Sequence, residues 1–275
     1  MKLRVIADKK IFPVGLGAMA LDEYNPKPTE ETAISLIKYA VEKGINFIDT
    51  ADVYGLGRNE KLIGQALNKE QKEKTVIATK VGCTRPDGHT WDTDGSHEHI
   101  KQGIKDSLQR LNIKQIYLYQ LHAPDHRVPF QESILALKEL QDKKLIKFIG
   151  LSNVDLSLLK EAQEIVNIVS VQNHFNLAFK KDEHELLPYL TENNIAYIPY
   201  FPLGGGRLLK NPKLINLAKE LKLTTSQIAL SWILNKWSIA IPIPGTKDKD
   251  HLNDNIKAAE IDLNEKTIEK LDSLF

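Results

Sequence analysis

The chain has 275 residues, with 37 basic and 36 acidic side chains and a formal net charge of +1, so no strong field favours nucleic acid or an anionic membrane. No run approaches the ~20 consecutive apolar residues of a membrane span. A single cysteine, Cys83, excludes an internal disulfide framework and a cysteine-rich metal site, which favours a reducing, cytoplasmic location.

The first 20 residues resemble a secretory signal in part. Positive charge precedes a mostly apolar run, and Ala-Met-Ala at residues 18–20 resembles a peptidase site. A proline and two glycines interrupt that run, however. The sequence instead predicts a hairpin over residues 3–12 and a first strand over residues 12–16, which we expect to be kept in the folded protein.

Residues 15–20, Gly-Leu-Gly-Ala-Met-Ala, match a dinucleotide-binding fingerprint of the Gly-x-Gly-x-x-Ala type. Such a fingerprint has to open a helix. Here Pro26 and Pro28 follow, and the next helical pattern begins only after Thr29, a suitable N-cap. We therefore reject a Rossmann-type site at these glycines.

Residues 44–64 read as a strand, a polar loop and a helix. A short apolar run stops at Asp49, Tyr54 follows five residues later, and helical spacing resumes after Glu60. In parallel α/β folds, ligands and chemistry collect at the carboxyl ends of strands. Taken alone, Asp49 could equally be a helix cap and Tyr54 a packing residue.

The alternation of strand and helix continues along the chain. Strands are predicted near residues 12–16, 45–48, 76–79, 116–121, 148–151, 168–171, 195–199 and 239–243, with helices between them and a final helix over 265–274. A long polar loop at residues 82–96 contains Trp91. Eight such units without a linker predict one domain, residues 1–275, folded as a (β/α)8 TIM barrel whose bottom is capped by the amino-terminal hairpin.

Polar side chains follow six successive predicted strands. They are Asp49, Lys80, His122, Asn153, Gln172 and Tyr200. Because the carboxyl ends of parallel strands meet on one face of a barrel, we expect these groups to converge, with Tyr54 on the adjoining loop. Each has a structural explanation when taken singly, but six at consecutive strand ends favour a functional site.

Aspartate, tyrosine, lysine and histidine together suit chemistry on a carbonyl group. A tyrosine hydroxyl has a pKa of ~10 in water and is a weak acid, but a neighbouring ammonium group favours its phenolate. Asp49 would hold Lys80 in place, and His122 would orient the carbonyl oxygen. No obvious nucleophile or metal triad accompanies them, so the electrons would have to come as hydride from a cofactor.

These motifs resemble the aldo-keto reductase family over essentially the whole chain. The resemblance is carried by residues 44–64, 77–80, 118–122, 149–153, 171–173, 200–204 and 243–246, and by Asn255. The family's catalytic tetrad falls on Asp49, Tyr54, Lys80 and His122, with Tyr54 as the implied proton donor. The resemblance implies reduction of an aldehyde or ketone to the alcohol with NADPH, or less often NADH.

The resemblance also implies a cofactor extended across the barrel mouth. Ser152, Asn153 and Gln172 would bind the nicotinamide carboxamide, and Tyr200 would stack on the ring. The backbone of residues 203–206 would enclose the pyrophosphate. The other implied contacts are Phe201, Leu203, Gly204, Gly205 and Gly245, and then Thr246, Lys247, His251 and Asn255 around the adenosine end, where helix amides would help to hold phosphate.

Two departures from the family pattern bear on the choice of cofactor. Phe201 stands where serine is common, and His251 stands where many members have arginine. Lys247 could supply the 2′-phosphate contact instead. We therefore expect a preference for NADPH, to be tested by comparing the Michaelis constants of the two cofactors.

The motif from Tyr200 to Gly205 is similar to the branch that contains bacterial pyridoxal reductases, so pyridoxal and aromatic aldehydes are candidate substrates. Variable loops would line the pocket, with Tyr24, His89, Trp91 and His126 as candidate residues. The chain lacks a long carboxyl-terminal loop, so an open pocket is expected. A monomer without nucleic-acid or membrane partners is also expected.

Two other functions stay open at this stage. A non-catalytic member of the family could bind NADPH as a sensor or accessory subunit, although the intact tetrad argues against it. A cofactor-free lyase or aldolase could use Lys80 as a Schiff base. That second reading leaves Tyr200, Gln172 and the segment from Gly245 to Asn255 without a role.

Overall fold

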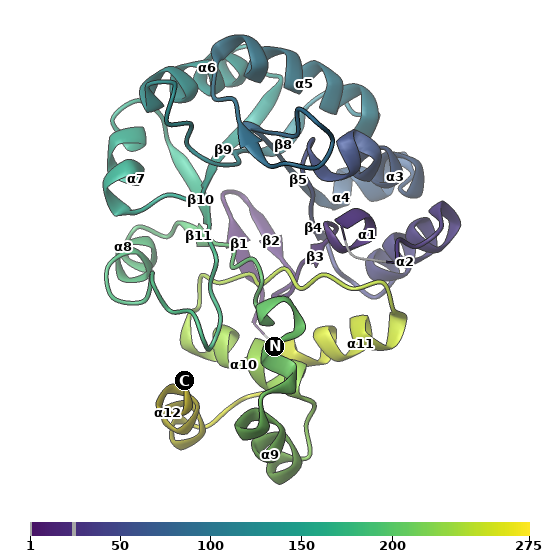
Figure 1. Cartoon of the computed structure of the whole chain (residues 1–275), viewed down its shortest axis with the longest axis vertical. Coiled ribbons are helices and arrows are strands. Elements are labelled where there is room, and N and C mark those ends of the chain that lie inside the picture. Colours follow the sequence, from purple (N-terminus) through teal and green to yellow (C-terminus); the bar gives the residue numbers. More distant parts are fainter. Residues whose placement is uncertain (1, 24–25) are drawn as a thin grey trace.

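Parallel strands form a curved sheet around the centre of the molecule in this computed structural model, which describes residues 2–23 and 26–275 (Figure 1). In spatial order the strands are β11 (Ala196–Tyr197), β10 (Ile168–Gln172), β9 (Ile146–Ser152), β8 (Ile116–Leu121), β5 (Val76–Val81), β4 (Phe47–Asp49) and β3 (Leu16–Gly17). Every pair is parallel, and strands that follow one another along the sheet are joined through helices. The predicted barrel is confirmed.

The predicted eighth strand, residues 239–243, closes the ring without forming a regular strand. On one side Tyr197 donates to the carbonyl of Ile239 at 3.1 Å and accepts from the amide of Ile241 at 2.8 Å. On the other side Gly15 donates to the carbonyl of Pro242 at 2.9 Å. Because Pro242 in this segment and Pro244 directly after it have no N–H to donate, the segment cannot build a continuous ladder.

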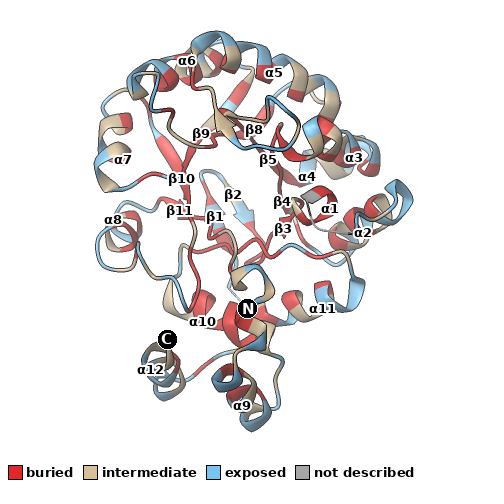
Figure 2. Ribbon diagram, viewed as in Figure 1, coloured by how far each residue is buried: buried red, intermediate tan, exposed pale blue. Residues whose placement is uncertain are grey.

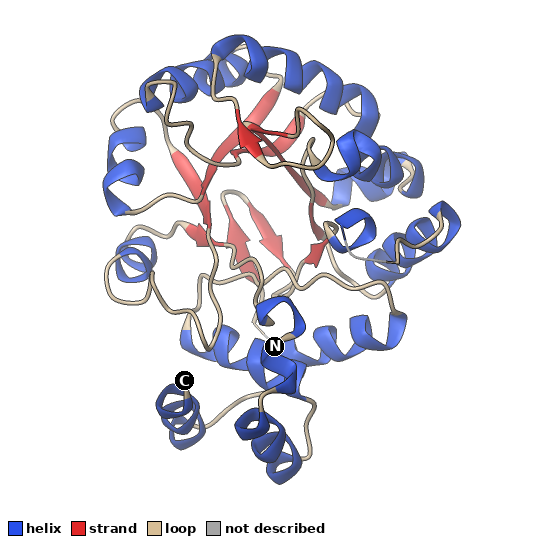
Figure 3. Cartoon of the chain, in the orientation of Figure 1, coloured by secondary structure: helices blue, strands red, loops and turns tan. Residues whose placement is uncertain are grey.

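Helices surround the strands (Figure 3). They are α2 (Glu30–Glu42), α3 (Arg58–Ala66), α4 (Lys69–Lys74), α5 (His97–Leu111), α6 (Phe130–Asp142), α7 (Leu156–Gln163), α8 (Leu186–Glu192), α9 (Pro212–Leu221), α10 (Thr225–Lys236), α11 (Lys249–Lys257) and α12 (Glu265–Leu274). Thr29 caps α2 as predicted, since its hydroxyl accepts from the amide of Thr32 at 3.2 Å. No helix in the described part of the chain is long and apolar enough to cross a membrane.

One expectation about the amino-terminal glycines is wrong. A short helix, α1 (Ala20–Glu23), begins directly after them, whereas no helix was predicted before Thr29. It is a single turn, too short for periodicity to reveal. The second glycine has a packing role, because a Cβ on Gly17 would lie 2.4 Å from the carbonyl oxygen of Ile243 in the closing segment. These glycines belong to the first strand region of a barrel. The observed sheet therefore agrees with rejecting them as a Rossmann fingerprint.

An antiparallel hairpin, β1 (Arg4–Ile6) and β2 (Lys9–Ile11), lies within the ring of strands (Figure 1). Ile6 and Ile11 are fully buried and pack with the inward side chains of the barrel, among them Phe47 and Leu118. Tyr117, next to the amino end of β8, donates to the carbonyl of Ile6 at 2.9 Å. The hairpin therefore caps the amino-terminal mouth, as predicted.

Buried residues gather on the strands and on the helix faces that point toward them (Figure 2). The loop predicted at residues 82–96 is more ordered than expected. It contains a second antiparallel hairpin, β6 (Cys83–Thr84) and β7 (Asp92–Thr93), which pairs through only two residues on each side. Strands this short carry no alternating pattern that the sequence could have revealed.

Candidate active site

A cavity of about 600 Å³ opens at the carboxyl ends of the strands. Every residue predicted from the sequence for the catalytic tetrad or the cofactor lines this cavity, except Lys80, Gly204 and Lys247. Asp49 ends β4, and His122 directly follows β8. The barrel thus brings together groups that are far apart in the chain.

Lys80 lies beneath the cavity floor, with a fully buried side chain. Its Nζ donates to Oδ2 of Asp49 at 2.6 Å and to the backbone carbonyl of Thr50 at 2.8 Å. A buried charge without a partner is very costly, so this pair keeps each member in place. The inaccessible nitrogen does not suit a Schiff-base lyase, which needs a lysine that substrate can reach.

Asp49 is fixed from a second direction as well. Its Oδ1 accepts from Nε2 of Gln172 at 2.7 Å, and Nε2 of Gln120 lies 3.4 Å from the same oxygen. The sequence placed Gln172 at the nicotinamide, but its amide nitrogen is directed at the carboxylate of Asp49. Only the carbonyl oxygen of this side chain remains for a carboxamide N–H.

Tyr54 begins a 3-10 turn, η1 (Tyr54–Gly57), and is 5% exposed. The Nζ of Lys80 lies 5.1 Å from the centroid of its ring. The turn needs left-handed backbone at Gly55, whose φ is 55°, and a Cβ there would meet the carboxyl group of Asp22 at 2.7 Å. The glycine therefore lets the phenol sit close above the buried ion pair.

His122 is the fourth residue of the predicted tetrad. Its ring centroid is 5.7 Å from that of Tyr54, at an interplanar angle of 82°. Burial lowers the pKa of His122 well below its ordinary value, and the positive charge of Lys80 adds to the shift. The imidazole is therefore neutral at physiological pH, with one nitrogen that donates a hydrogen bond and one that accepts.

A buried polar group that sequence reasoning missed lies beside Asp52, two residues before Tyr54. Glu60 accepts from the hydroxyl of Thr79 at 2.6 Å and from Nε of Arg110 at 2.7 Å. Burial, followed by the charge of Glu60, raises the pKa of Asp52 well above its ordinary value. A glutamate on the inward face of α3, where apolar residues are expected, was the available signal.

The residues expected around the nicotinamide form one hydrogen-bonded group. Asn153 has a left-handed φ of 58°, and its Nδ2 donates to the carbonyl of His122 at 2.9 Å. Its Oδ1 accepts from the hydroxyl of Tyr200 at 2.8 Å, and Ser152 is buried beside it. The amide side chain of Asn153 therefore links His122 to Tyr200, the residue expected to stack on the nicotinamide.

Behind Tyr200 stands a stack of rings that the sequence did not indicate. The ring of His174 lies 5.5 Å from that of Tyr200 at 14°, and 4.2 Å from that of Phe179 at 11°. Burial lowers the pKa of His174, so this ring is neutral at physiological pH. The ring of Tyr200, which is expected to stack on the nicotinamide, is thus packed against His174.

The segment expected at the pyrophosphate fits a phosphate group. It forms a 3-10 turn, η2 (Gly204–Gly206), in which all three glycines have positive φ, and a Cβ at Gly205 or Gly206 would meet nothing within 4 Å. Open space beside such a backbone lets a ligand approach closely. Phe201 also has a positive φ, 48°, and lines the same cavity.

The adenosine end differs from expectation in two contacts. Asp248 caps α11, and its carboxylate accepts from the amides of Asp250 at 2.7 Å and His251 at 3.0 Å. Those amides were predicted to be available for phosphate, but the cap occupies them. Lys247 donates to the carbonyl of Pro26 at 2.9 Å. Its Nζ retains two further N–H groups for an anion.

The four candidate pocket residues from the variable loops differ in whether they line the cavity. Trp91 lines the cavity, and His89 and His126 are not among its lining residues. The side chain of His126 is 82% exposed. Tyr24 lies outside the described residues.

Comparisons with known protein families and sequences agree on one family. The model of the aldo/keto reductase family matches residues 13–275. An uncharacterized oxidoreductase of Schizosaccharomyces pombe is 38% identical over 271 residues, covering 97% of this chain and 88% of that protein. Pyridoxine 4-dehydrogenase of Escherichia coli is 32% identical over 279 residues, covering 98% of this chain and 96% of that protein.

Solved structures show the same likeness. A thermostable aldo-keto reductase in complex with the inhibitor epalrestat matches with a TM-score of 0.86 at 30% identity, covering 100% of both chains. An aldo-keto reductase of Klebsiella pneumoniae in complex with NADPH matches with a TM-score of 0.86 at 24% identity, covering 99% of this chain and 94% of that one. The second likeness concerns the fold alone.

Proposed function

Since this chain belongs to the aldo/keto reductase family and is an NAD(P)H-dependent oxidoreductase, we propose that it reduces an aldehyde or ketone to the alcohol, with NADPH as cofactor and Tyr54 as proton donor. The observation that carries this proposal is the buried ion pair of Lys80 and Asp49, 2.6 Å apart, below the ring of Tyr54 and beside the neutral imidazole of His122.

Each side chain has a defined task in this reaction. His122 donates a hydrogen bond to the carbonyl oxygen and orients it toward Tyr54. Tyr54 gives its phenolic proton to that oxygen, and Lys80 stabilises the phenolate that remains. Asp49 and Gln172 hold Lys80 beneath the ring. When bound, the reduced nicotinamide supplies the hydride that the carbonyl carbon takes up.

The proposed cofactor site uses residues that fit a dinucleotide. Asn153 and Tyr200 suit the nicotinamide, and the open glycine turn at residues 204–206 suits the pyrophosphate. Lys247 and His251 supply positive or protonatable groups near the adenosine end, which supports NADPH over NADH. Equal Michaelis constants for the two cofactors would contradict this preference.

The proposed substrates are pyridoxal and simple aromatic aldehydes. Support comes from the relative named pyridoxine 4-dehydrogenase and from three rings, Tyr54, Trp91 and His122, that border the carbonyl end of the cavity. We also propose that the protein acts as a cytoplasmic, single-domain monomer. Size-exclusion chromatography with light scattering tests the oligomeric state directly.

The deciding experiment follows the loss of NADPH absorbance with a panel of aldehydes. Tyr54→Phe should retain NADPH affinity while losing roughly a hundredfold or more in kcat, because only the proton donor is removed. Fluorescence titration with NADPH provides the binding control. Cofactor binding without turnover of any aldehyde by the wild-type protein would favour the sensor or accessory subunit instead.

A further inference from the structure

Trp91 belongs to the β6–β7 hairpin and yet lies against the catalytic rings. Its ring centroid is 6.4 Å from that of Tyr54 and 6.0 Å from that of His122, and both contacts are edge-on. The side chain is still 45% exposed. Its other neighbour is the guanidinium group of Arg85, which lies 4.1 Å from the indole centroid. The indole therefore forms the outer wall of the carbonyl end of the cavity.

The hairpin cannot hold this indole by its own pairing. Its ladder pairs Cys83 with Thr93 and Thr84 with Asp92, and the amide of Asp94 donates to the carbonyl of Gly82 at 3.0 Å next to it. An isolated two-stranded hairpin is marginal even when it is longer than this one. The position of Trp91 therefore depends on contacts between the hairpin and the rest of the protein.

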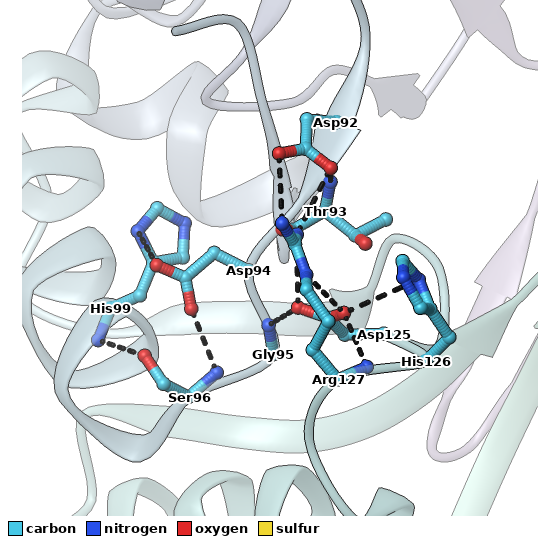
Figure 4. Close-up of polar contacts among 9 residues, drawn as sticks. All are labelled: Asp92, Thr93, Asp94, Gly95, Ser96, His99, Asp125, His126 and Arg127. Atoms are coloured by element: carbon cyan, nitrogen blue, oxygen red, sulfur yellow. Dashed lines mark hydrogen bonds and ion pairs between the residues drawn. The ribbon is translucent and has the colours of Figure 1, made fainter.

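Arg127, in the loop between β8 and α6, supplies those contacts (Figure 4). Its Nη1 donates to Oδ2 of Asp92 at 3.1 Å, and its Nη2 donates to Oδ1 at 3.0 Å. Nη2 also donates to the carbonyl of Thr93. Asp92 is the residue after Trp91. The guanidinium group therefore fixes the backbone of the hairpin directly beside the indole.

Asp125 anchors Arg127 from the protein side. Its carboxylate is buried and accepts from Nε of Arg127 at 3.1 Å, from the amide of Arg127 at 2.9 Å and from the amide of Gly95 at 3.1 Å. Burial opposes ionisation of Asp125, but these hydrogen bonds outweigh it and hold the pKa of the carboxyl group below its ordinary value. An exposed ion pair alone would contribute little, whereas this one is tied to a buried carboxylate.

The junction between the two loops is also closely packed. A Cβ at Gly95 would lie 2.7 Å from Oγ of Ser133, and that hydroxyl donates to the carbonyl of Gly95 at 2.6 Å. The segment between β7 and α5 is therefore held to the first turn of α6. Arg127 and this contact hold the hairpin at two separate points.

Resting on the proposed function, we propose that Arg127 is a positioning residue that holds Trp91 as a preformed aromatic wall, and that this wall gives the enzyme its preference for flat aromatic aldehydes. Arg127 does not line the cavity and acts only through the hairpin. An aromatic ring beside Trp91 gains edge or face contact that a short alkyl chain cannot match. Selectivity is thus set by a salt bridge outside the pocket.

The test compares kcat/KM for benzaldehyde and for butanal with NADPH in four variants. Trp91→Ala and Arg127→Met should each lower the ratio of the two values by roughly fivefold to tenfold, mainly through the KM for benzaldehyde. Arg127→Lys should give a ratio between those of the wild type and Arg127→Met, because an ammonium group cannot bind both oxygens of Asp92 in a bidentate way. Lys138→Met is the matched control, because it removes a cation from an exposed pair with Asp142 on α6 and should change nothing.

A second readout needs neither substrate nor cofactor. Hydrogen–deuterium exchange in Arg127→Met should increase across residues 83–95 and stay unchanged in the strands that carry the tetrad. An unchanged ratio, or unchanged exchange over residues 83–95, would overturn the inference. A wild-type protein that turns over no aldehyde of the panel would contradict the proposed function, and the exchange experiment would still decide whether Arg127 holds the hairpin.

Discussion

The two ends of the cavity are built in different ways. At the carbonyl end, Asp49 and Lys80 are buried and each is held by two or more partners. At the adenosine end, Asp248 and His251 are exposed and depend on local backbone contacts. Proton transfer needs groups held to a fraction of an ångström, whereas binding a long, flexible ligand does not. The rigid end is therefore the one where the proposed reaction would change bonds.

The largest effect is expected at the rigid end, from Lys80→Met. Removing the cation leaves the carboxylate of Asp49 buried without its partner, which should lower the free energy of unfolding by about 3–5 kcal/mol. Turnover should fall by roughly a hundredfold or more, because the phenolate loses its stabilising charge. Urea unfolding and steady-state kinetics measure the two effects.

The control for Lys80→Met is Lys74→Met, which removes a lysine from an exposed i,i+4 pair with Glu70 on α4. It should leave stability and turnover unchanged. Equal effects of the two variants on stability and turnover would contradict the proposal that the carbonyl end of the cavity is held more rigidly than the protein surface.

A pH experiment sharpens the contrast through His122. Its folded-state pKa is depressed by burial and then by Lys80, so below pH ~6.5 the unfolded chain takes up a proton that the folded protein excludes. Wild-type stability should therefore fall as the pH drops below ~6.5, by up to about 1.4 kcal/mol per pH unit from this group. His122→Asn should lack this component when thermal melts from pH 7 to 5 are compared.

A smaller effect is expected at the adenosine end, from Lys247→Met. If Lys247 faces the 2′-phosphate, the ratio of kcat/KM for NADPH to that for NADH should fall roughly fivefold, the size of one exposed charged contact. Thermal stability should not change. An unaltered ratio would remove Lys247 from the cofactor site and leave the preference without its proposed cause.

The smallest effect is expected from Asp248→Asn. Asparagine keeps an oxygen that can cap α11, so the melting temperature should stay the same. Removing the negative charge beside the helix amides should lower the KM for NADPH about twofold. A rise in KM would show that the cap itself shapes the adenosine end.

The sequence predicted the rigid end well because barrel geometry converts position in the chain into position in space. Once Asp49, His122 and Gln172 were placed at strand ends, their convergence followed without any knowledge of partners. Their particular bonds were not predictable, since Gln172 and Asp49 are separated by 123 positions. The amide of Gln172 was accordingly expected at the cofactor rather than at the carboxylate.

The remaining differences come from interactions that leave no periodic signal. The β6–β7 hairpin depends on Arg127, which is 35 positions from Asp92, and neither residue stands out in its own segment. The short helix α1 is one turn long. The eighth strand was predicted over residues 239–243 although Pro242 lies inside it, and that proline argues against a regular ladder. Local patterns therefore placed the elements, and long-range polar contacts decided the details.

The hairpin that caps the amino-terminal mouth has a kinetic consequence. With Ile6 and Ile11 filling that end of the ring, the proposed dinucleotide and aldehyde would both enter and leave through the opening at the carboxyl ends of the strands. If the aldehyde binds at this opening before the dinucleotide, it blocks entry of the dinucleotide. Inhibition at high aldehyde concentration should therefore be relieved by raising the concentration of dinucleotide.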